Sequence, residues 1–313
     1  MKCVIIHTPH AMKSKVEQYK NYIRDKLFQK FDVVDFWESK FRNHTSILAS
    51  EACGQYDCLI ALGGDGTFNE VLNGIAEKHN KPVVGFLPCG TVNDVARSLG
   101  ISRKLDKALN VILDGKTFKH DVFKVNNRYG IYVVAAGLLT GSSYIAGQEN
   151  KRRYGWLAYA YTGIKELFRK HRMAMKIECD GKVFEGSFAF MFLSNSNSIA
   201  GMPVNKNAEL NDGLIDVVLM RQFGFLKITN LISVIRLLKL FIVKIKKIKT
   251  SKYFVHIHAK SVKVYNYAGA NLNIDGEFGG NDNLVTLHML KEEIEIFVPN
   301  KNKRVSPYLI EKF

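Results

Sequence analysis

Short apolar runs alternate with amphipathic stretches over the first hundred residues. One stretch, Tyr19–Phe28, has its apolar residues at helical spacing. The apolar runs are Val4–Ile6, Val33–Phe36, Cys58–Leu62, Val71–Ala76 and Val83–Leu87. This alternation is typical of strand–helix–strand units that build a parallel sheet. We therefore predict an N-terminal, Rossmann-like parallel α/β domain over residues 1–121.

Beyond residue 121 the pattern changes to short runs in which apolar and polar residues alternate. We expect these runs to be strands at Gly130–Ala136, Met173–Cys179, Val183–Leu193, Leu214–Met220, Phe254–His258 and Ser261–Tyr267. A period of two, with Gly and Asn between the runs, is typical of antiparallel sheets. The sequence therefore predicts a second domain, residues 122–290, that is a mainly antiparallel β-sandwich.

Two stretches of the second domain have the apolar spacing of helices. They are Tyr154–Lys170 and Lys227–Lys249, and the second carries several lysines among its apolar positions. Neither contains the run of about 18 uncharged apolar residues that a membrane-spanning helix needs. Each could pack against the sheet or lie in a membrane interface.

The charge of the chain is strongly basic and unevenly distributed. The net charge is +16, and residues 217–274 contain eleven Lys or Arg and no acidic residue. Such a stretch suits an anionic partner, either nucleic acid or the anionic cytoplasmic leaflet of a membrane, although a solvated basic face is the simpler alternative. The five cysteines form no CxxC pair and the N-terminus lacks a signal-peptide run. We expect a cytoplasmic protein.

The first candidate for chemistry is a glycine cluster between an apolar strand and a helix. Glycines let the backbone approach a polyphosphate, and free N–H groups of a helix's first turn favour anions. A carboxylate at Asp65 would repel phosphates unless a cation lies between them, which predicts Mg²⁺ bridging protein and nucleotide. The alternative is a tight turn in which Asp65 caps the helix. The predicted nucleotide-binding residues are Gly63, Gly64, Asp65, Gly66, Thr67, Asn69 and Glu70.

A second loop repeats this arrangement about thirty residues later. It follows the apolar run Val83–Leu87 and contains Gly90, Thr91, Asn93 and Asp94. Both loops would emerge at the carboxyl edge of a parallel sheet, where ligands bind. We therefore expect Asp65 and Asp94 to converge on one metal–nucleotide site, with Gly90, Thr91 and Asn93 contacting the nucleotide or fixing the loop.

The motif Gly-Gly-Asp-Gly-Thr followed by Gly-Thr-Val-Asn-Asp-Val-Ala-Arg resembles the diacylglycerol kinase catalytic-domain family. That family includes soluble bacterial lipid kinases and is related to sphingosine and ceramide kinases. Segments around His120–Tyr129, Ala135–Gly137, Ala208–Leu214 and Asn273–Gly280 extend the resemblance along the chain. It implies an active site in the cleft between two domains, ATP and Mg²⁺ as cofactors, and a C-terminal segment of about 291–313 that completes the first domain.

A third motif, Asp275-Gly276-Glu277, supplies a candidate base. Its glycine permits a turn that presents a carboxylate to the cleft. The resemblance implies that Glu277 accepts the proton of the substrate hydroxyl and that Asp275 supports it. Without the other motifs, an ordinary surface turn would explain these residues.

The resemblance also implies a structural Mg²⁺ in the second domain. The matching loop offers the Asp212 side chain and the carbonyl groups of Glu209 and Leu214. An Asn-Asp-Gly turn without a metal is the competing interpretation.

The chain departs from the family pattern at its first loop. The family has Asn-Pro-x-x-Gly after the first strand, whereas this chain has Thr8-Pro9-His10-Ala11-Met12. Met12 replaces a glycine that can adopt a positive φ. We expect Thr8, Pro9 and Lys13 to contact the nucleotide at this edge.

Together these observations predict an ATP- and Mg²⁺-dependent kinase that phosphorylates a lipid alcohol, diacylglycerol above all, at the inner face of the membrane. An NAD kinase would share the Gly63–Thr67 motif but would lack the other two. A non-catalytic basic module that binds membrane or nucleic acid would leave the three carboxylate-bearing loops unexplained, and we expect no nucleic-acid partner. The sequence leaves open whether the chain forms a homodimer.

Overall fold

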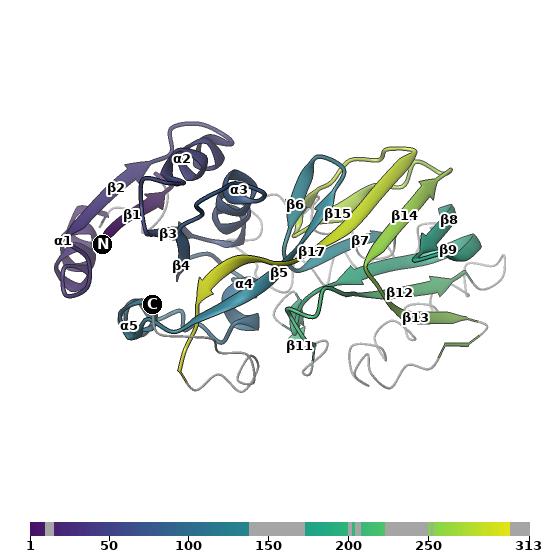
Figure 1. Cartoon of the computed structure of the whole chain (residues 1–313). Helices are drawn as coiled ribbons and strands as arrows, with labels where there is room; N and C mark the ends of the chain where they lie inside the picture. The colour runs from purple at the N-terminus through teal and green to yellow at the C-terminus, as the bar shows by residue number, and fades with distance from the viewer. Residues whose placement is uncertain are drawn as a thin grey trace.

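The structure is a computed structural model of the chain. It describes residues 1–9, 16–137, 173–199, 202–203, 208–222, 250–251 and 253–300. The helices predicted for 154–170 and 227–249, and Lys13, lie outside the described residues. Figure 1 shows an N-terminal α/β part beside a C-terminal part built of strands.

The N-terminal part is a parallel sheet with helices on both faces. Its strands lie in the order β4-β3-β1-β2 and all pair in parallel. Helix α1 packs with α5, and α2 packs with α3 on the opposite face (Figure 1). Its elements are β1 (Lys2–His7), α1 (Val16–Leu27), β2 (Val33–Glu38), α2 (His44–Ala52), β3 (Cys58–Gly63), α3 (Asp65–Ile75), β4 (Val83–Pro88), α4 (Asp94–Ser98) and α5 (Leu105–Asp114).

The C-terminal part consists of antiparallel strands. Strand β9 pairs with β7, β8 and β12, and β12 pairs with β13. The strands are β5 (Thr117–Val125), β6 (Arg128–Gly130), β7 (Val133–Gly137), β8 (Met173–Cys179), β9 (Lys182–Ser194), β10 (Ser198–Ile199), β11 (Met202–Pro203), β12 (Ile215–Arg221), β13 (Phe254–Ala259), β14 (Ser261–Asn266), β15 (Leu272–Ile274), β16 (Glu277–Phe278) and β17 (Leu284–Phe297).

In the described part of the chain, two apolar clusters form the core. One lies within the C-terminal strands, and it takes Phe188, Met191 and Leu193 of β9. The other fills the α/β part and continues onto the opposite face of β9 at Phe190 and Phe192. Alternate residues of one strand therefore reach different clusters, as the pleat of a strand requires. The predicted combination of a parallel α/β part and a mainly antiparallel β part is confirmed.

Strand β17 belongs to both parts. Its first half pairs with β14, and its last residues pair with the start of β5 and, at Ile296, with Val84 of β4. The register shifts between Leu290 and Ile294, where Glu292 has a φ of 52°. The C-terminal segment predicted to start at about residue 291 thus begins inside a longer strand, which crosses from one part to the other (Figure 1).

A buried carboxylate holds this crossing in place. Asp121 of β5 accepts N–H bonds from Glu292 (2.7 Å) and from Gly213 (2.6 Å). Burial raises its pKa to about 6. Asp121 therefore ties the bulge of β17 to the loop that contains Asp212.

Candidate active site

The two predicted glycine loops touch each other. Strands β3 and β4 are neighbours, with Gly63 opposite Pro88. A Cβ atom added to Gly90 would lie 2.6 Å from the Cα atom of Gly64. Gly90 is therefore required by the close approach of two backbones rather than by its own φ, and both loops lie at the carboxyl edge of the sheet.

Asp65 joins the two loops. Its carboxylate accepts N–H bonds from Asp94 (3.0 Å) and Val95 (3.1 Å) at the start of α4. Burial raises its pKa, and these backbone bonds oppose that rise. Asp65 thus caps a helix, but α4 rather than the helix it begins. Because a carboxylate has about four lone-pair sites, it could still contribute an oxygen to a cation.

Asn93 and Thr91 lie in different environments within the second loop. Asn93 is buried with a φ of 55°, and its side chain bonds both the N–H (3.0 Å) and the carbonyl (2.8 Å) of Gly90. Its side chain therefore fixes the loop. Thr91 is exposed and Asp94 is buried.

The third motif places its two carboxylates in opposite environments. Asp275 is buried and accepts N–H bonds from Ile131 (2.7 Å), Tyr132 (3.0 Å) and Val133 (2.9 Å). Burial raises its pKa to about 6. Glu277 is exposed, and its Oε1 lies 3.3 Å from the position that a Cβ of Gly66 would take. Glu277 therefore faces the first turn of α3, where N–H groups attract anions.

Tyr132 was not predicted from the sequence, where it stands within an apolar run. Its hydroxyl oxygen lies 3.2 Å from the position that a Cβ of Gly276 would take. The pKa of this tyrosine is raised well above its usual value, first by burial and then by four carboxylates. These are Asp275, Asp65, Asp94 and Glu277. All four predicted catalytic carboxylates thus act electrostatically on one buried hydroxyl.

The other predicted nucleotide residues have several roles in the structure. Thr8 and Pro9 follow β1 at the same sheet edge, Thr8 half-buried and Pro9 exposed. A Cβ on Gly63 would lie 2.2 Å from the Thr67 hydroxyl oxygen, so Thr67 packs over that glycine. The Glu70 carbonyl accepts the Ser46 hydroxyl (2.7 Å).

Asn69 points toward the β part of the molecule. Its side-chain nitrogen donates to the Asp275 carboxylate (2.9 Å) and to the carbonyl of Tyr129 (3.2 Å). In the structure, Asn69 thus holds the Asp275 turn against α3.

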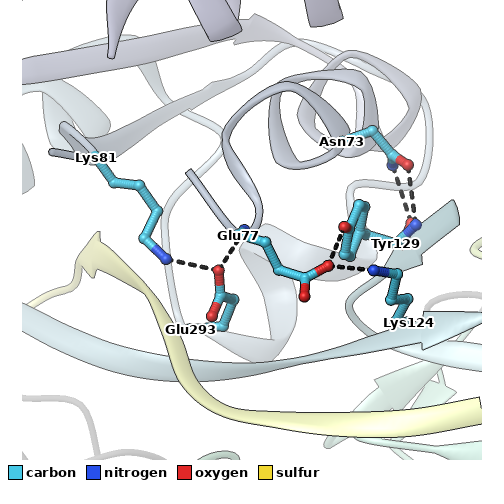
Figure 2. Close-up of polar contacts among 6 residues, drawn as sticks. All are labelled: Asn73, Glu77, Lys81, Lys124, Tyr129 and Glu293. Atoms are coloured by element: carbon cyan, nitrogen blue, oxygen red, sulfur yellow. Dashed lines mark hydrogen bonds and ion pairs between the residues drawn. The ribbon is translucent and has the colours of Figure 1, made fainter. Parts of the chain in front are cut away.

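After Asn69 in the chain, further polar residues connect the α/β part to the β part. We call Asn69, Asn73, Glu77 and Lys81, which are spaced four apart along α3 and the turn after it, the α3 seam. Figure 2 shows Asn73, Glu77 and Lys81 with their partners. Asn73 bonds the N–H and the carbonyl of Tyr129 (both 2.9 Å). Glu77 contacts Tyr129 and Lys124, and Lys81 pairs with Glu293 (2.6 Å).

The loop predicted to hold a structural Mg²⁺ adopts an Asx turn. Asp212 accepts the N–H of Leu214 (2.9 Å), and burial raises the pKa of its half-buried carboxyl group. Glu209 is exposed. One Asp212 oxygen is engaged in the turn, so the arrangement fits both the metal-free turn and a hard cation held by oxygen atoms.

Comparison with known families agrees with this architecture. The family model of the diacylglycerol kinase catalytic domain matches residues 2–125. The family model of the YegS C-terminal NAD kinase beta sandwich-like domain matches residues 132–287.

Relatives of known name match along most of the chain. A diacylglycerol kinase of Staphylococcus aureus (strain MRSA252) is 34% identical over 309 residues, which cover 95% of this chain and 92% of the relative. That of strain JH9 is 37% identical over 246 residues, 78% of this chain and 75% of the relative.

Solved structures share the fold. A putative diacylglycerol kinase from Bacillus anthracis str. Sterne superposes with a TM-score of 0.77 at 23% identity, covering 95% of this chain and 97% of the other. Another diacylglycerol kinase structure from this strain gives a TM-score of 0.72 at 20% identity, covering 96% and 97%. Such identities establish the fold alone. From the motifs, the two matched domains and the full-length relatives, we conclude that the chain belongs to the diacylglycerol kinase catalytic-domain family and is a lipid kinase.

Proposed function

We propose that this kinase transfers the γ-phosphoryl group of ATP to the hydroxyl of diacylglycerol and forms phosphatidic acid. The observation that carries the proposal is the pair of touching glycine loops, which Asp65 joins, with Glu277 facing the first turn of α3 beside them. The names of the Staphylococcus relatives support the choice of substrate.

The site requires a cation if a polyphosphate is to bind there. Asp65 and Asp94 lie next to the backbone N–H groups that would receive the phosphates, and two carboxylates alone would repel them. We assign these two residues as the holders of Mg²⁺, which supplies neutralisation of the charge on the transferring group. The exposed Thr91 hydroxyl and the N–H groups of Gly64 and Gly66 would orient the phosphates.

Glu277 is assigned as the general base. Among the four carboxylates it is the exposed one, so a lipid hydroxyl can reach it from solvent or from a membrane. Its position against the first turn of α3 puts it beside the N–H groups that would hold the phosphates. Phosphoryl transfer depends mostly on positioning and charge stabilisation, and from this position Glu277 would orient an acceptor hydroxyl toward the phosphate.

The test is transfer of radiolabelled γ-phosphate from ATP to a panel of acceptors in mixed micelles with Mg²⁺. The panel contains diacylglycerol, monoacylglycerol, a sphingoid base, a polyprenol and NAD. We expect labelled phosphatidic acid, and a Glu277→Gln variant should lower kcat by about 10²- to 10⁴-fold. The matched control is Glu185→Gln, an exposed glutamate on β9, which should keep full activity.

Each result of this panel has a distinct meaning. Label on another lipid would replace diacylglycerol as the substrate, and label on NAD would make the enzyme an NAD kinase. Retention of activity within a few-fold in Glu277→Gln would remove Glu277 from the role of base.

We further propose that the protein works at the anionic inner face of the membrane. The acid-free stretch 217–274 with its eleven basic residues supports this location. Within the described part of the chain, no helix has the length and apolar character to cross a bilayer. Binding to vesicles that contain anionic lipid should weaken as salt rises from about 0.05 M to about 0.5 M, because the Debye length shortens. Equal binding to neutral vesicles would contradict the proposal.

A further inference from the structure

Two histidines and an aspartate meet on neighbouring strands, outside the site described above. Asp216 lies on β12, and His256 and His258 lie on β13. In the antiparallel register, Asp216 stands opposite His258 and Val218 opposite His256. Residues two apart on a strand share a face, so both imidazoles and the carboxylate lie on the same face of this strand pair.

The three side chains converge on one point. The Nε2 atoms of His256 and His258 each lie 3.0 Å from Oδ1 of Asp216. All the ligand atoms lie within 4.8 Å of one another. The side chains of Asp216 and His256 are only 7% and 9% exposed, whereas that of His258 is 52% exposed. Two of the three side chains are therefore buried, and the group is open to solvent on the side of His258.

Hydrogen bonds alone can account for this grouping, since one carboxylate oxygen can accept from two imidazole N–H groups. The spacing also fits a metal ion. In tetrahedral geometry, ligand atoms at about 2.0–2.2 Å from a zinc ion are separated from one another by roughly 3.3–3.6 Å, close to the spacing here. Two imidazole nitrogens and one carboxylate oxygen suit zinc and similar transition metals, whereas Mg²⁺ and Ca²⁺ prefer oxygen ligands throughout.

We propose that Asp216, His256 and His258 form a site for a divalent transition-metal ion, zinc in the first place, with solvent completing the coordination. The ion would link β12 to β13. These strands are joined in the chain only through residues 222–253, so a metal bond between them restrains a long connection. A ligand that binds only the folded state stabilises it in proportion to the logarithm of its concentration above Kd.

This site differs in its ligands from the Asp212 loop. Asp212 lies in the turn just before β12, close enough for its carboxylate to interact electrostatically with His258 and Asp216. The loop offers oxygen atoms alone, while the new site depends on two imidazoles. Metal preference and mutation can therefore separate the two.

The experiment uses the full-length protein, freed of metal with a chelator and titrated with Zn²⁺ against a chromophoric competitor. We expect saturable binding that is weakened at least roughly 100-fold in His258→Gln and in Asp216→Asn. The matched control is His288→Gln, an exposed strand histidine on β17, which should bind as wild type does. Saturating Zn²⁺ should raise Tm in wild type and His288→Gln and leave His258→Gln unchanged.

Two further measurements guard against other sources of binding. Co²⁺ in place of Zn²⁺ should give absorption bands without a thiolate charge-transfer band, which excludes the five cysteine thiols, including the exposed Cys89, as ligands. Because His258 is half-exposed, its variant should fold, and circular dichroism checks this. The proposal fails if Zn²⁺ does not bind, or binds equally to His258→Gln. It also fails if excess Mg²⁺ or Asp212→Asn abolishes binding while His258→Gln preserves it.

Discussion

Asp275 and Glu277 are two residues apart, yet one is a buried acceptor of backbone bonds and the other an exposed carboxylate, the proposed base. The Asp275 carboxylate accepts three backbone N–H groups and the amide of Asn69. This carboxylate organises the turn that presents Glu277. A substitution at each position should therefore affect different properties of the enzyme.

We predict that Asp275→Asn destabilises the fold as well as lowering activity. Asparagine offers one acceptor oxygen and turns an NH₂ group toward buried donors, a cost of about 3 kcal/mol. Tm should fall by at least roughly 5 °C in a thermal scan. Glu277→Gln is the comparison, since a change at an exposed site alters stability by about 0.5 kcal/mol or less. Equal Tm values for the two variants would contradict the assignment.

The buried His120 makes a pH-dependent contribution to stability. Burial lowers its pKa to about 4, whereas an unfolded histidine has a pKa of about 6.5. The unfolded state therefore binds more protons between these values, and the free energy of unfolding falls as pH drops through them. Asp121 and Asp275, with pKa values raised to about 6, act in the opposite direction.

We predict that His120→Gln removes this contribution. On going from pH 7 to pH 5, the change in the free energy of unfolding should be more favourable in the variant than in wild type by about 2 kcal/mol. Urea unfolding at both pH values measures it, with the exposed His288→Gln as control. Parallel changes in wild type and His120→Gln would show that His120 is not protonated on unfolding.

Sequence reasoning located the candidate catalytic motifs because each is a local pattern, a glycine turn after an apolar strand. It could not locate the contacts that join them. That Asp65 caps α4, and that Asn69 reaches Asp275, depends on how separate segments pack. Tyr132 was missed for the same reason, because its side chain comes within electrostatic range of the carboxylates only in the folded chain.

Helix α2 shows why some elements escaped prediction. Its buried residues are Thr45, Ala49 and Ala52, which are too small to produce a strong apolar pattern. Small residues are required because α3 approaches closely: a Cβ on Gly74 would lie 2.3 Å from the carbonyl oxygen of Ser46. The packing that defines α2 therefore weakens the pattern that would have revealed it.

Helix α3 begins at the proposed phosphate site and carries the α3 seam. We predict that Asn73→Ala lowers the free energy of unfolding by about 1–3 kcal/mol, because the N–H and carbonyl of Tyr129 would lose their partner. Chemical denaturation measures the change. The control is Asn271→Ala at an exposed position, which should be nearly neutral. Equal stabilities would mean that water replaces the Asn73 side chain.

The molecule as a whole should unfold in one step, although its two parts match separate domain families. Strand β17 supplies residues to both apolar clusters, Phe297 to one and Leu287 to the other. We predict that the calorimetric and van't Hoff enthalpies agree. Phe297→Ala should lower the free energy of unfolding by about 3–5 kcal/mol. The variant should still unfold in a single transition. Two resolved transitions would show that the parts unfold independently.

The shared strand also sets the order of events during synthesis. All helices and strands of the α/β part up to α5 have been made by residue 114, but the partner of β4 at Ile296 comes far later. At about 5–20 residues per second, the ribosome needs roughly 10–40 s to add the intervening chain. Throughout that interval the outer edge of β4 is an unpaired strand edge on a nascent chain, the kind of surface that chaperones cover and that drives aggregation when they do not.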